Sequence, residues 1–262
     1  LEARWREKVV LVTGASSGIG AAIALKFSEE GANVAIVGRN EIKLKNISDK
    51  CIARGRKPLS IIADLTKDAD IRRVIDEVIL SYGKLNILIN NAGTSTSASI
   101  ISDTAMDVFD QLIAVNLRSA VFLTHLAAPH LIKSKGNIVN ISSIGANQPL
   151  ISENFSYCAS KAALDHFARS IAMELGGKGV RVNNVNPGPV KTEYFDTAFE
   201  NEEERDKMFD ILKKASVLKR IAEPNEIADL VLYLASDKAR SITGSSLVID
   251  NGVMLNGAII RV

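Results

Sequence analysis

The sequence has 262 residues, 47% of them hydrophobic, and a formal net charge of +2 from 32 basic and 30 acidic residues. This length and composition allow one large buried core, so we expect a single soluble domain over residues 1–262. The balanced charge argues against nucleic acid and anionic membranes as partners and favours small molecules. Cys51 and Cys158 lack metal-ligand spacing, so we expect reduced thiols, no metal site and a cytoplasmic protein.

Short β-branched runs followed by turn residues predict seven strands, at 8–14, 33–38, 58–64, 85–93, 136–143, 180–188 and 245–252. Apolar residues at helical spacing predict helices between them, at 19–30, 41–54, 68–82, 104–133, 155–175 and 226–235. Strands that are apolar on both faces and alternate with helices are typical of a parallel sheet covered on both sides. We therefore expect an α/β, Rossmann-type, doubly wound fold with its ligand crevice beyond the carboxyl ends of the strands.

The longest apolar stretch, residues 112–132, is the one candidate for a membrane span. It contains Asn116, Arg118, His125 and His130, each of which is costly in hydrocarbon. We expect a helix packed in protein, and no membrane partner.

The stretch TGASSGIG, residues 13–20, places Gly14, Gly18 and Gly20 where the first strand turns into a helix. Glycines there let the backbone approach a pyrophosphate, and the helix N-terminus offers unpaired N–H groups and partial positive charge. The spacing differs from the G-x-G-x-x-G fingerprint, so a tight connection without a ligand is the alternative.

The same stretch contains GASSG, which fits the nucleophile elbow of a serine hydrolase with Ser16 as nucleophile. In that fold the acid and the histidine follow the serine, and an earlier strand supplies part of the oxyanion hole. Here no strand precedes the elbow, and His125, His130 and His166 all fall within predicted helices. The sequence therefore disfavours a hydrolase.

The end of the second strand, at Gly38 and Arg39, is where a dinucleotide-binding fold meets the adenosine ribose. An acidic residue there would bind the 2′-hydroxyl of NAD, whereas arginine suits the 2′-phosphate of NADP. NADP(H) is favoured over NAD(H), although Glu41 lies nearby. Asp64, at the end of the third strand, is predicted either to accept from the adenine amino group or to cap the next turn.

Taken together, six motifs resemble those of the short-chain dehydrogenase/reductase family, over nearly the whole chain. They are TGASSGIG, NNAG at 90–93, Asn116 in VNL, Ser143 in NISS, Tyr157 with Lys161 in YCASK, and NPGPVKT at 186–192. One departure is DNG at 250–252, where many members of the family have two glycines; it puts only the C-terminal packing in doubt.

The resemblance implies a catalytic set of Asn116, Ser143, Tyr157 and Lys161. Tyr157 and Lys161 lie four residues apart on one helix face, so the ammonium can stabilise a phenolate. Lowering the pKa of a phenol from about 10 to near neutrality requires roughly 4 kcal/mol of preferential interaction with its anion. Tyr157 would be the general acid in reduction and the base in oxidation, and Ser143 would hold the developing alkoxide. In the family Asn116 bends its helix and holds a water of a proton relay; a buried amide bonded to the adjacent loop is the alternative.

The resemblance also implies the residues that hold the cofactor. Around the nicotinamide, the backbone near Val190 and the side chain of Thr192 would fix the ring for transfer of the pro-S hydride. The full expected set is Gly14, Ser16, Ser17, Gly18, Ile19, Gly20, Arg39, Asn40, Asp64, Leu65, Asn91, Ala92, Gly93, Tyr157, Lys161, Pro187, Gly188, Val190 and Thr192.

A helical substrate lid is expected at about 193–220, where aromatic and aliphatic residues alternate with charges. Its apolar underside is predicted to comprise Tyr194, Phe195, Phe199, Met208, Phe209 and Leu212, and Ile151 and Phe155 are expected on the opposite wall. We therefore expect a moderately apolar ketone or aldehyde, or the corresponding alcohol. Two apolar helices suggest a homodimer or homotetramer. A catalytically silent dinucleotide sensor is the alternative, although the Ser143, Tyr157 and Lys161 set is intact.

Overall fold

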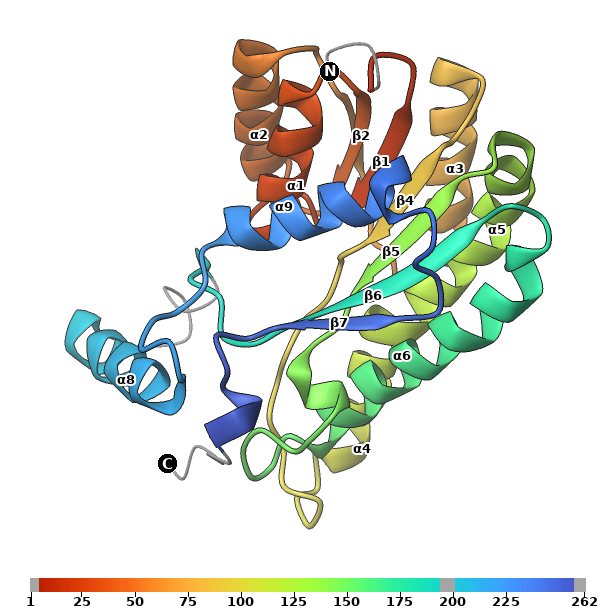
Figure 1. The fold of residues 1–262 in the computed structure, drawn as a ribbon. Coiled ribbons are helices and arrows are strands. Elements are labelled where there is room, and N and C mark those ends of the chain that lie inside the picture. Colours follow the sequence, from red (N-terminus) through yellow and green to blue (C-terminus); the bar gives the residue numbers. More distant parts are fainter. Residues whose placement is uncertain (1–4, 194–200, 257–262) are drawn as a thin grey trace.

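The computed structural model describes residues 5–193 and 201–256, which form one parallel sheet with helices on both sides (Figure 1). The seven strands are in the order β3-β2-β1-β4-β5-β6-β7, and every neighbouring pair is parallel. Their bounds are β1 Val9–Thr13, β2 Asn33–Gly38, β3 Leu59–Ile62, β4 Ile87–Asn90, β5 Asn137–Ile141, β6 Arg181–Pro187 and β7 Ser246–Ile249. The expected doubly wound Rossmann fold is confirmed.

Two apolar layers enclose the sheet because alternate strand residues point to opposite faces. On β1, Val10 and Val12 pack in one layer while Val9 and Leu11 pack in the other. The first layer is covered by α1 Gly18–Glu29, α2 Glu41–Arg54 and α9 Pro224–Ala235. The second is covered by α3 Asp68–Tyr82, α5 Ser119–Ser134 and α6 Phe155–Gly176 (Figure 1).

The predicted helix at 104–133 is built in three parts. It comprises α4 Ala105–Ile113, a π-helical turn Ala114–Arg118 and then α5. The π-turn contains Asn116, which agrees with the local bend that the family resemblance implies. A π-turn inside an α-helix commonly marks a functional site.

By length and hydropathy, the continuous helical stretch Ala105–Ser134 could cross a membrane. Its inner face instead lies in the core, where Leu112, Leu123, Ala127 and Leu131 are buried. The helix is thus packed on the sheet as expected, and core helices of soluble proteins pass the same test.

The expected lid lies partly outside the described residues, because Tyr194, Phe195 and Phe199 are not described. The described part is α8 Glu202–Ala215, which stands away from the body of the sheet (Figure 1). Its first turn carries Glu202, Glu203 and Glu204, and its last turn carries Lys213 and Lys214. These charges complement the helix dipole, and residues 201–207 form a largely exposed helix start.

A buried chain of asparagine amides crosses the sheet at the level of the ligand crevice. Asn90 Nδ2 on β4 donates to Asn140 Oδ1 on β5 at 2.9 Å, and Asn140 Nδ2 donates to Asn184 Oδ1 on β6 at 2.9 Å. Asn140 and Asn184 are fully buried. Because each amide satisfies the next, the three strands are fixed in register immediately below their carboxyl ends.

Replacing the central amide is expected to destabilise the fold. Asn140→Ala leaves Asn184 Oδ1 without its Asn140 donor, while Asn90 Nδ2 keeps Thr124 Oγ1 as an acceptor, so the free energy of unfolding should fall by about 1–3 kcal/mol. Urea titration followed by circular dichroism measures this. The exposed Asn225→Ala is the control, with a change within about 0.5 kcal/mol. Equal stability of the two variants would show that the amide chain contributes nothing.

Candidate active site

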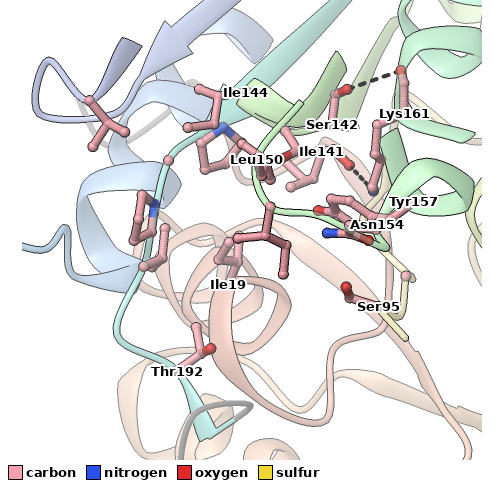
Figure 2. A pocket seen from close by; sticks show the side chains of 18 of the residues that line it. Ile19, Ser95, Ile141, Ser142, Ile144, Leu150, Asn154, Tyr157, Lys161 and Thr192 are labelled. Atoms are coloured by element: carbon pink, nitrogen blue, oxygen red, sulfur yellow. Dashed lines mark hydrogen bonds between the residues drawn. The ribbon is translucent and has the colours of Figure 1, made fainter. Parts of the chain in front are cut away.

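The carboxyl ends of the strands open into a pocket of about 470 Å³, and Ser143 is among its lining residues. Tyr157 and Lys161 line the same pocket (Figure 2). Its walls are formed by the start of α1, the segment after β4, the ends of β5 and β6 with the segments that follow them, the start of α6, and α8. Among the predicted cofactor residues, the pocket is lined by Ile19, Asn91, Gly93, Tyr157, Lys161, Pro187, Gly188, Val190 and Thr192. Residues far apart in the sequence thus meet where the fold predicts a ligand.

The glycine turn has the geometry of a close backbone cradle. Gly14 and Gly18 have φ values of +63° and +55°, which disfavour any side chain. A Cβ on Gly20 would lie 2.3 Å from the carbonyl oxygen of Gly14. Ser17 is the N-cap of α1, yet its side chain makes no capping hydrogen bond. The helix start therefore keeps backbone donors for an anion, which fits the diphosphate of a dinucleotide.

Thr13 and Asn91 hold this turn against the end of β4. Thr13 Oγ1 accepts from the backbone N–H groups of Asn91 and Ala92, each at 3.0 Å. Asn91 Nδ2 donates to the carbonyl oxygens of Thr13 and Gly14, at 2.8 and 3.1 Å. The TG and NNAG motifs thus form one rigid unit under the expected cofactor.

The end of β2 presents the residues expected near the adenosine. Arg39 is exposed, and Gly38 is buried against Ser16, whose Oγ would lie 3.3 Å from a Cβ on Gly38. Asn40 caps α2 by accepting from the backbone N–H of Lys43 at 2.9 Å. Arg39 is exposed at the carboxyl end of β2 and Ser16 is half-buried, and the contact of either residue with a cofactor stays a prediction.

Asp64 has the turn-capping contacts that the sequence left as an alternative. Its Oδ1 accepts from Thr66 N at 3.1 Å and from Thr66 Oγ1 at 2.8 Å. These two hydrogen bonds lower the pKa of the Asp64 carboxyl. Contact of Asp64 and the neighbouring Leu65 with the adenine stays a prediction.

Lys161 is the most strongly perturbed group in the pocket. Only 5% of its surface is exposed, and burial lowers its pKa from 10.5 to about 8, opposed by the negative charge of Asp165. Its Nζ donates to the carbonyl oxygen of Ile141 at 2.9 Å and lies 5.8 Å from the centre of the Tyr157 ring (Figure 2). The cation is thus placed to act on the phenol.

Ser143 is arranged as a hydrogen-bond donor. Its Oγ accepts from the backbone N–H of Gly145 at 3.0 Å, which leaves the hydroxyl hydrogen for a substrate oxygen. The neighbouring Ser142 instead donates to the Lys161 carbonyl oxygen at 3.4 Å. Both serines lie just beyond the end of β5 and line the pocket, so they differ in their hydrogen bonds, and the choice of Ser143 as the catalytic serine stays a prediction.

Asn116 forms hydrogen bonds to the adjacent loop, as expected from the alternative interpretation of a buried amide bonded to that loop. Oδ1 accepts from Thr94 N at 2.8 Å, and Nδ2 donates to Thr94 O at 2.9 Å and Ser160 Oγ at 3.1 Å. Gly93 lies between this amide and Lys161, since a Cβ on it would be 3.4 Å from both. Asn116 thus fixes the loop beside Lys161, and its place in a proton relay stays a prediction.

Two buried residues were missed by the sequence analysis as parts of this site. Asn186 Nδ2 donates to Asp165 Oδ2 at 2.8 Å and to the Ser143 carbonyl oxygen at 3.1 Å. Asp165 follows Lys161 by one helical turn, so the spacing of Tyr157, Lys161 and Asp165 was a readable signal. The pair links α6, β5 and β6 behind the pocket.

Among the described residues of the expected lid underside, Met208 and Leu212 lie at the pocket and Phe209 does not, and the assignment of Phe155 to the opposite wall is wrong. Met208 and Leu212 on α8 line the pocket, and so does Ile151. Phe155 instead stacks on Phe109 of α4, with ring centres 6.5 Å apart, because it faces the opposite side of the helix start from the pocket.

The hydrolase alternative has no support in the site. His125 lies on α5 and is exposed, His130 is half-buried on the same helix, and His166 is exposed on α6 beside Arg169. Within the described residues, none of the three lines the pocket that contains Tyr157.

Comparison with known proteins identifies the class to which this fold and site belong. A family model described as Enoyl-(Acyl carrier protein) reductase matches residues 14–254. L-xylulose reductase of Caenorhabditis elegans is 36% identical over 252 residues, which cover 95% of this chain and 97% of that protein. Meso-2,3-butanediol dehydrogenase of Serratia marcescens is 34% identical over 249 residues, covering 95% of each.

A solved structure from C. elegans, a short-chain dehydrogenase/reductase of unknown function with cofactor, superposes with a TM-score of 0.90. It is 33% identical, and the match covers 96% of this chain and 97% of that one. The chain therefore belongs to the short-chain dehydrogenase/reductase family. It is an oxidoreductase acting on alcohols and carbonyl compounds, and its homologues use nicotinamide cofactors.

The depressed pKa of Lys161 predicts a pH-dependent stability. Between about pH 8 and pH 10.5 the unfolded chain holds the lysine proton while the folded chain loses it. The free energy of unfolding therefore increases as the pH rises through this window. Below about 8 the buried cation destabilises the fold by roughly 3 kcal/mol. Lys161→Met should therefore gain stability relative to wild type at pH 7, and the difference should shrink towards pH 10.

Denaturant titrations at several pH values measure that difference, with the exposed Lys50→Met as control. A difference that stays constant from pH 7 to 10 would contradict a depressed pKa of Lys161.

Proposed function

We propose that the protein is an NADP(H)-dependent oxidoreductase that interconverts a moderately apolar ketone or aldehyde and its alcohol, with Tyr157 as acid and base. The observation that carries this proposal is the placement of the buried Lys161 ammonium beside the Tyr157 ring and of Ser143 as a free donor in the same pocket. A catalytically silent protein that only senses a dinucleotide would not require these groups to face the same pocket.

When bound, the nicotinamide ring supplies the hydride for reduction or accepts it in oxidation. The glycine turn and the residues Pro187 to Thr192 would hold the cofactor along the strand ends. The Ser143 hydroxyl donates to the substrate oxygen and stabilises the negative charge that develops on it. Tyr157 gives its proton to that oxygen in reduction and takes it back in oxidation, and the Lys161 ammonium stabilises the phenolate form.

The choice of NADP(H) rests on Arg39. Its exposed guanidinium stands at the end of β2, and Gly38 supplies no acidic side chain to repel a 2′-phosphate. Glu41 lies in the first turn of α2, where it also compensates the helix dipole.

The apolar substrate preference rests on Leu150, Ile151, Met208 and Leu212, which are among the residues that line the pocket. Two relatives are named for hydroxylated compounds, L-xylulose and meso-2,3-butanediol. A substrate panel should therefore contain hydroxy ketones beside apolar ketones, aldehydes, quinones and steroids.

A homodimer or homotetramer in the cytoplasm completes the proposal. Exposed apolar residues near the start of α4, among them Ile100, Ile101 and Met106, support self-association. Light scattering of the purified chain tests the oligomeric state.

Removal of the Tyr157 hydroxyl is expected to abolish most turnover. Tyr157→Phe should lower kcat/KM for carbonyl reduction by about 10²–10⁴-fold, because the substrate oxygen loses its proton donor. Oxidation of NADPH at 340 nm measures the rate, and fluorescence titration checks that the cofactor still binds. Tyr233→Phe on exposed α9 is the matched control. Full activity of Tyr157→Phe would refute the assignment.

Removal of the Arg39 guanidinium is expected to weaken the binding of NADPH but not the binding of NADH. Loss of hydrogen bonds to a charged phosphate, about 1.5–3 kcal/mol, should raise KM for NADPH by roughly 10- to 100-fold in Arg39→Ala. KM for NADH should stay nearly constant. Arg54→Ala, at the far end of α2, is the control. Equal KM values of the wild-type enzyme for both cofactors would contradict the NADP(H) preference.

A further inference from the structure

Asn154 lies in the pocket wall immediately before α6 and three residues before Tyr157 (Figure 2). Only 6% of its surface is exposed. Residues three apart at a helix face are neighbours, with Cβ atoms roughly 5–6 Å apart. A substrate whose oxygen meets Tyr157 would therefore place its adjacent atoms near the Asn154 amide.

The Asn154 amide makes no hydrogen bond within the described part of the chain. Its Oδ1 is fully buried without a donor, and Nδ2, which has no protein acceptor there, is not among the fully buried unpaired atoms. Asn154 is the N-cap of α6, yet its side chain does not cap the helix. Asn40 and Asn201 occupy the same position on α2 and α8, and each accepts a backbone N–H at 2.9 Å. Asn154 is thus released from the usual role of a capping asparagine.

An unpaired buried amide oxygen is costly, and most buried polar groups in proteins are paired. At Asn154 this unpaired amide lies beside the residue expected to meet the reacting carbonyl. A ligand that pairs it would recover this free energy only when it is bound next to Tyr157.

The chemistry of the missing partner follows from the amide and its surroundings. An amide offers one acceptor and a donor group, and a hydroxyl can satisfy both because it donates and accepts. A carboxylate cannot donate to Oδ1, and an ammonium cannot accept from Nδ2. Lys161 is the one charged residue among the described residues that line the pocket, and Leu150, Met208 and Leu212 give it an apolar side.

We propose that Asn154 is a specificity-determining residue that binds the hydroxyl of an α-hydroxy ketone, on the carbon next to the reacting carbonyl. The apolar remainder of the substrate lies against Leu150, Met208 and Leu212. The corresponding alcohol is a vicinal diol. This assignment rests on the proposed function and defines its substrate class.

The test compares three octanones that differ at one position: octan-4-one, 5-hydroxyoctan-4-one and 5-methoxyoctan-4-one. The methoxy compound keeps the electron withdrawal of the oxygen but cannot donate to Oδ1. Wild-type kcat/KM should be highest for the hydroxy ketone. Asn154→Leu should lower kcat/KM for the hydroxy ketone by about 10- to 100-fold and change that for octan-4-one by less than about threefold.

Asn225→Leu, at an exposed position, is the matched control and should keep the wild-type ratio. Thermal unfolding checks that each variant is folded, and Asn154→Ala replaces Asn154→Leu if the larger side chain prevents folding. Equal losses for all three ketones would assign Asn154 a structural role and overturn the proposal. A wild-type enzyme with the same kcat/KM for the hydroxy and methoxy compounds would overturn it too, with water as the partner of the amide. No turnover of any carbonyl compound in either panel would overturn the proposed function itself.

Discussion

The burial of one ammonium group constrains the architecture of this site. Lys161 is almost completely removed from water, which disfavours its charged form, and two neighbours offset that cost. The Ile141 carbonyl, at the end of β5, accepts from Nζ, and Asp165 supplies negative charge from the next turn of α6. Helix α6 must therefore lie against the end of β5, and this places Tyr157 in the pocket one turn earlier.

The same requirement extends to β6 through Asn186. Its amide donates to Asp165 and to the carbonyl of Ser143, so the counter-charge of Lys161 and the segment carrying the serine hydroxyl share one buried partner. The chain then continues directly into Gly188 and Val190, which line the pocket on the cofactor side. Cofactor and proton-transfer groups are thus positioned by one network, supported from below by the amides of Asn90, Asn140 and Asn184.

Much of the fold could be predicted from the sequence because the local signals for helix ends and the pattern of buried residues indicate the same elements. Residues 41–54 and 68–82 were predicted with the bounds observed for α2 and α3, since an asparagine cap, acidic first turns and apolar periodicity all mark the same ends. A local bend at Asn116 was implied by resemblance alone, because apolar spacing over 104–133 is equally compatible with an unbroken helix, and the structure has a π-turn there. Phe155 was assigned to the wrong wall because its direction depends on packing against Phe109.

The site divides in the same way between chemistry and specificity. The roles of Tyr157 and Lys161 can be predicted from their spacing, because residues four apart on a helix face the same side. Asn154 has no such signature: Asn40 and Asn201 share its residue type and its place before a helix, and they differ from it in backbone conformation, extended against ψ 25° at Asn154, and in their capping hydrogen bonds. The role proposed for Asn154 depends on the pocket that the segments after β4 and β5 form with α8. Reaction type is therefore encoded locally, and substrate choice is encoded in tertiary contacts that single residues do not reveal.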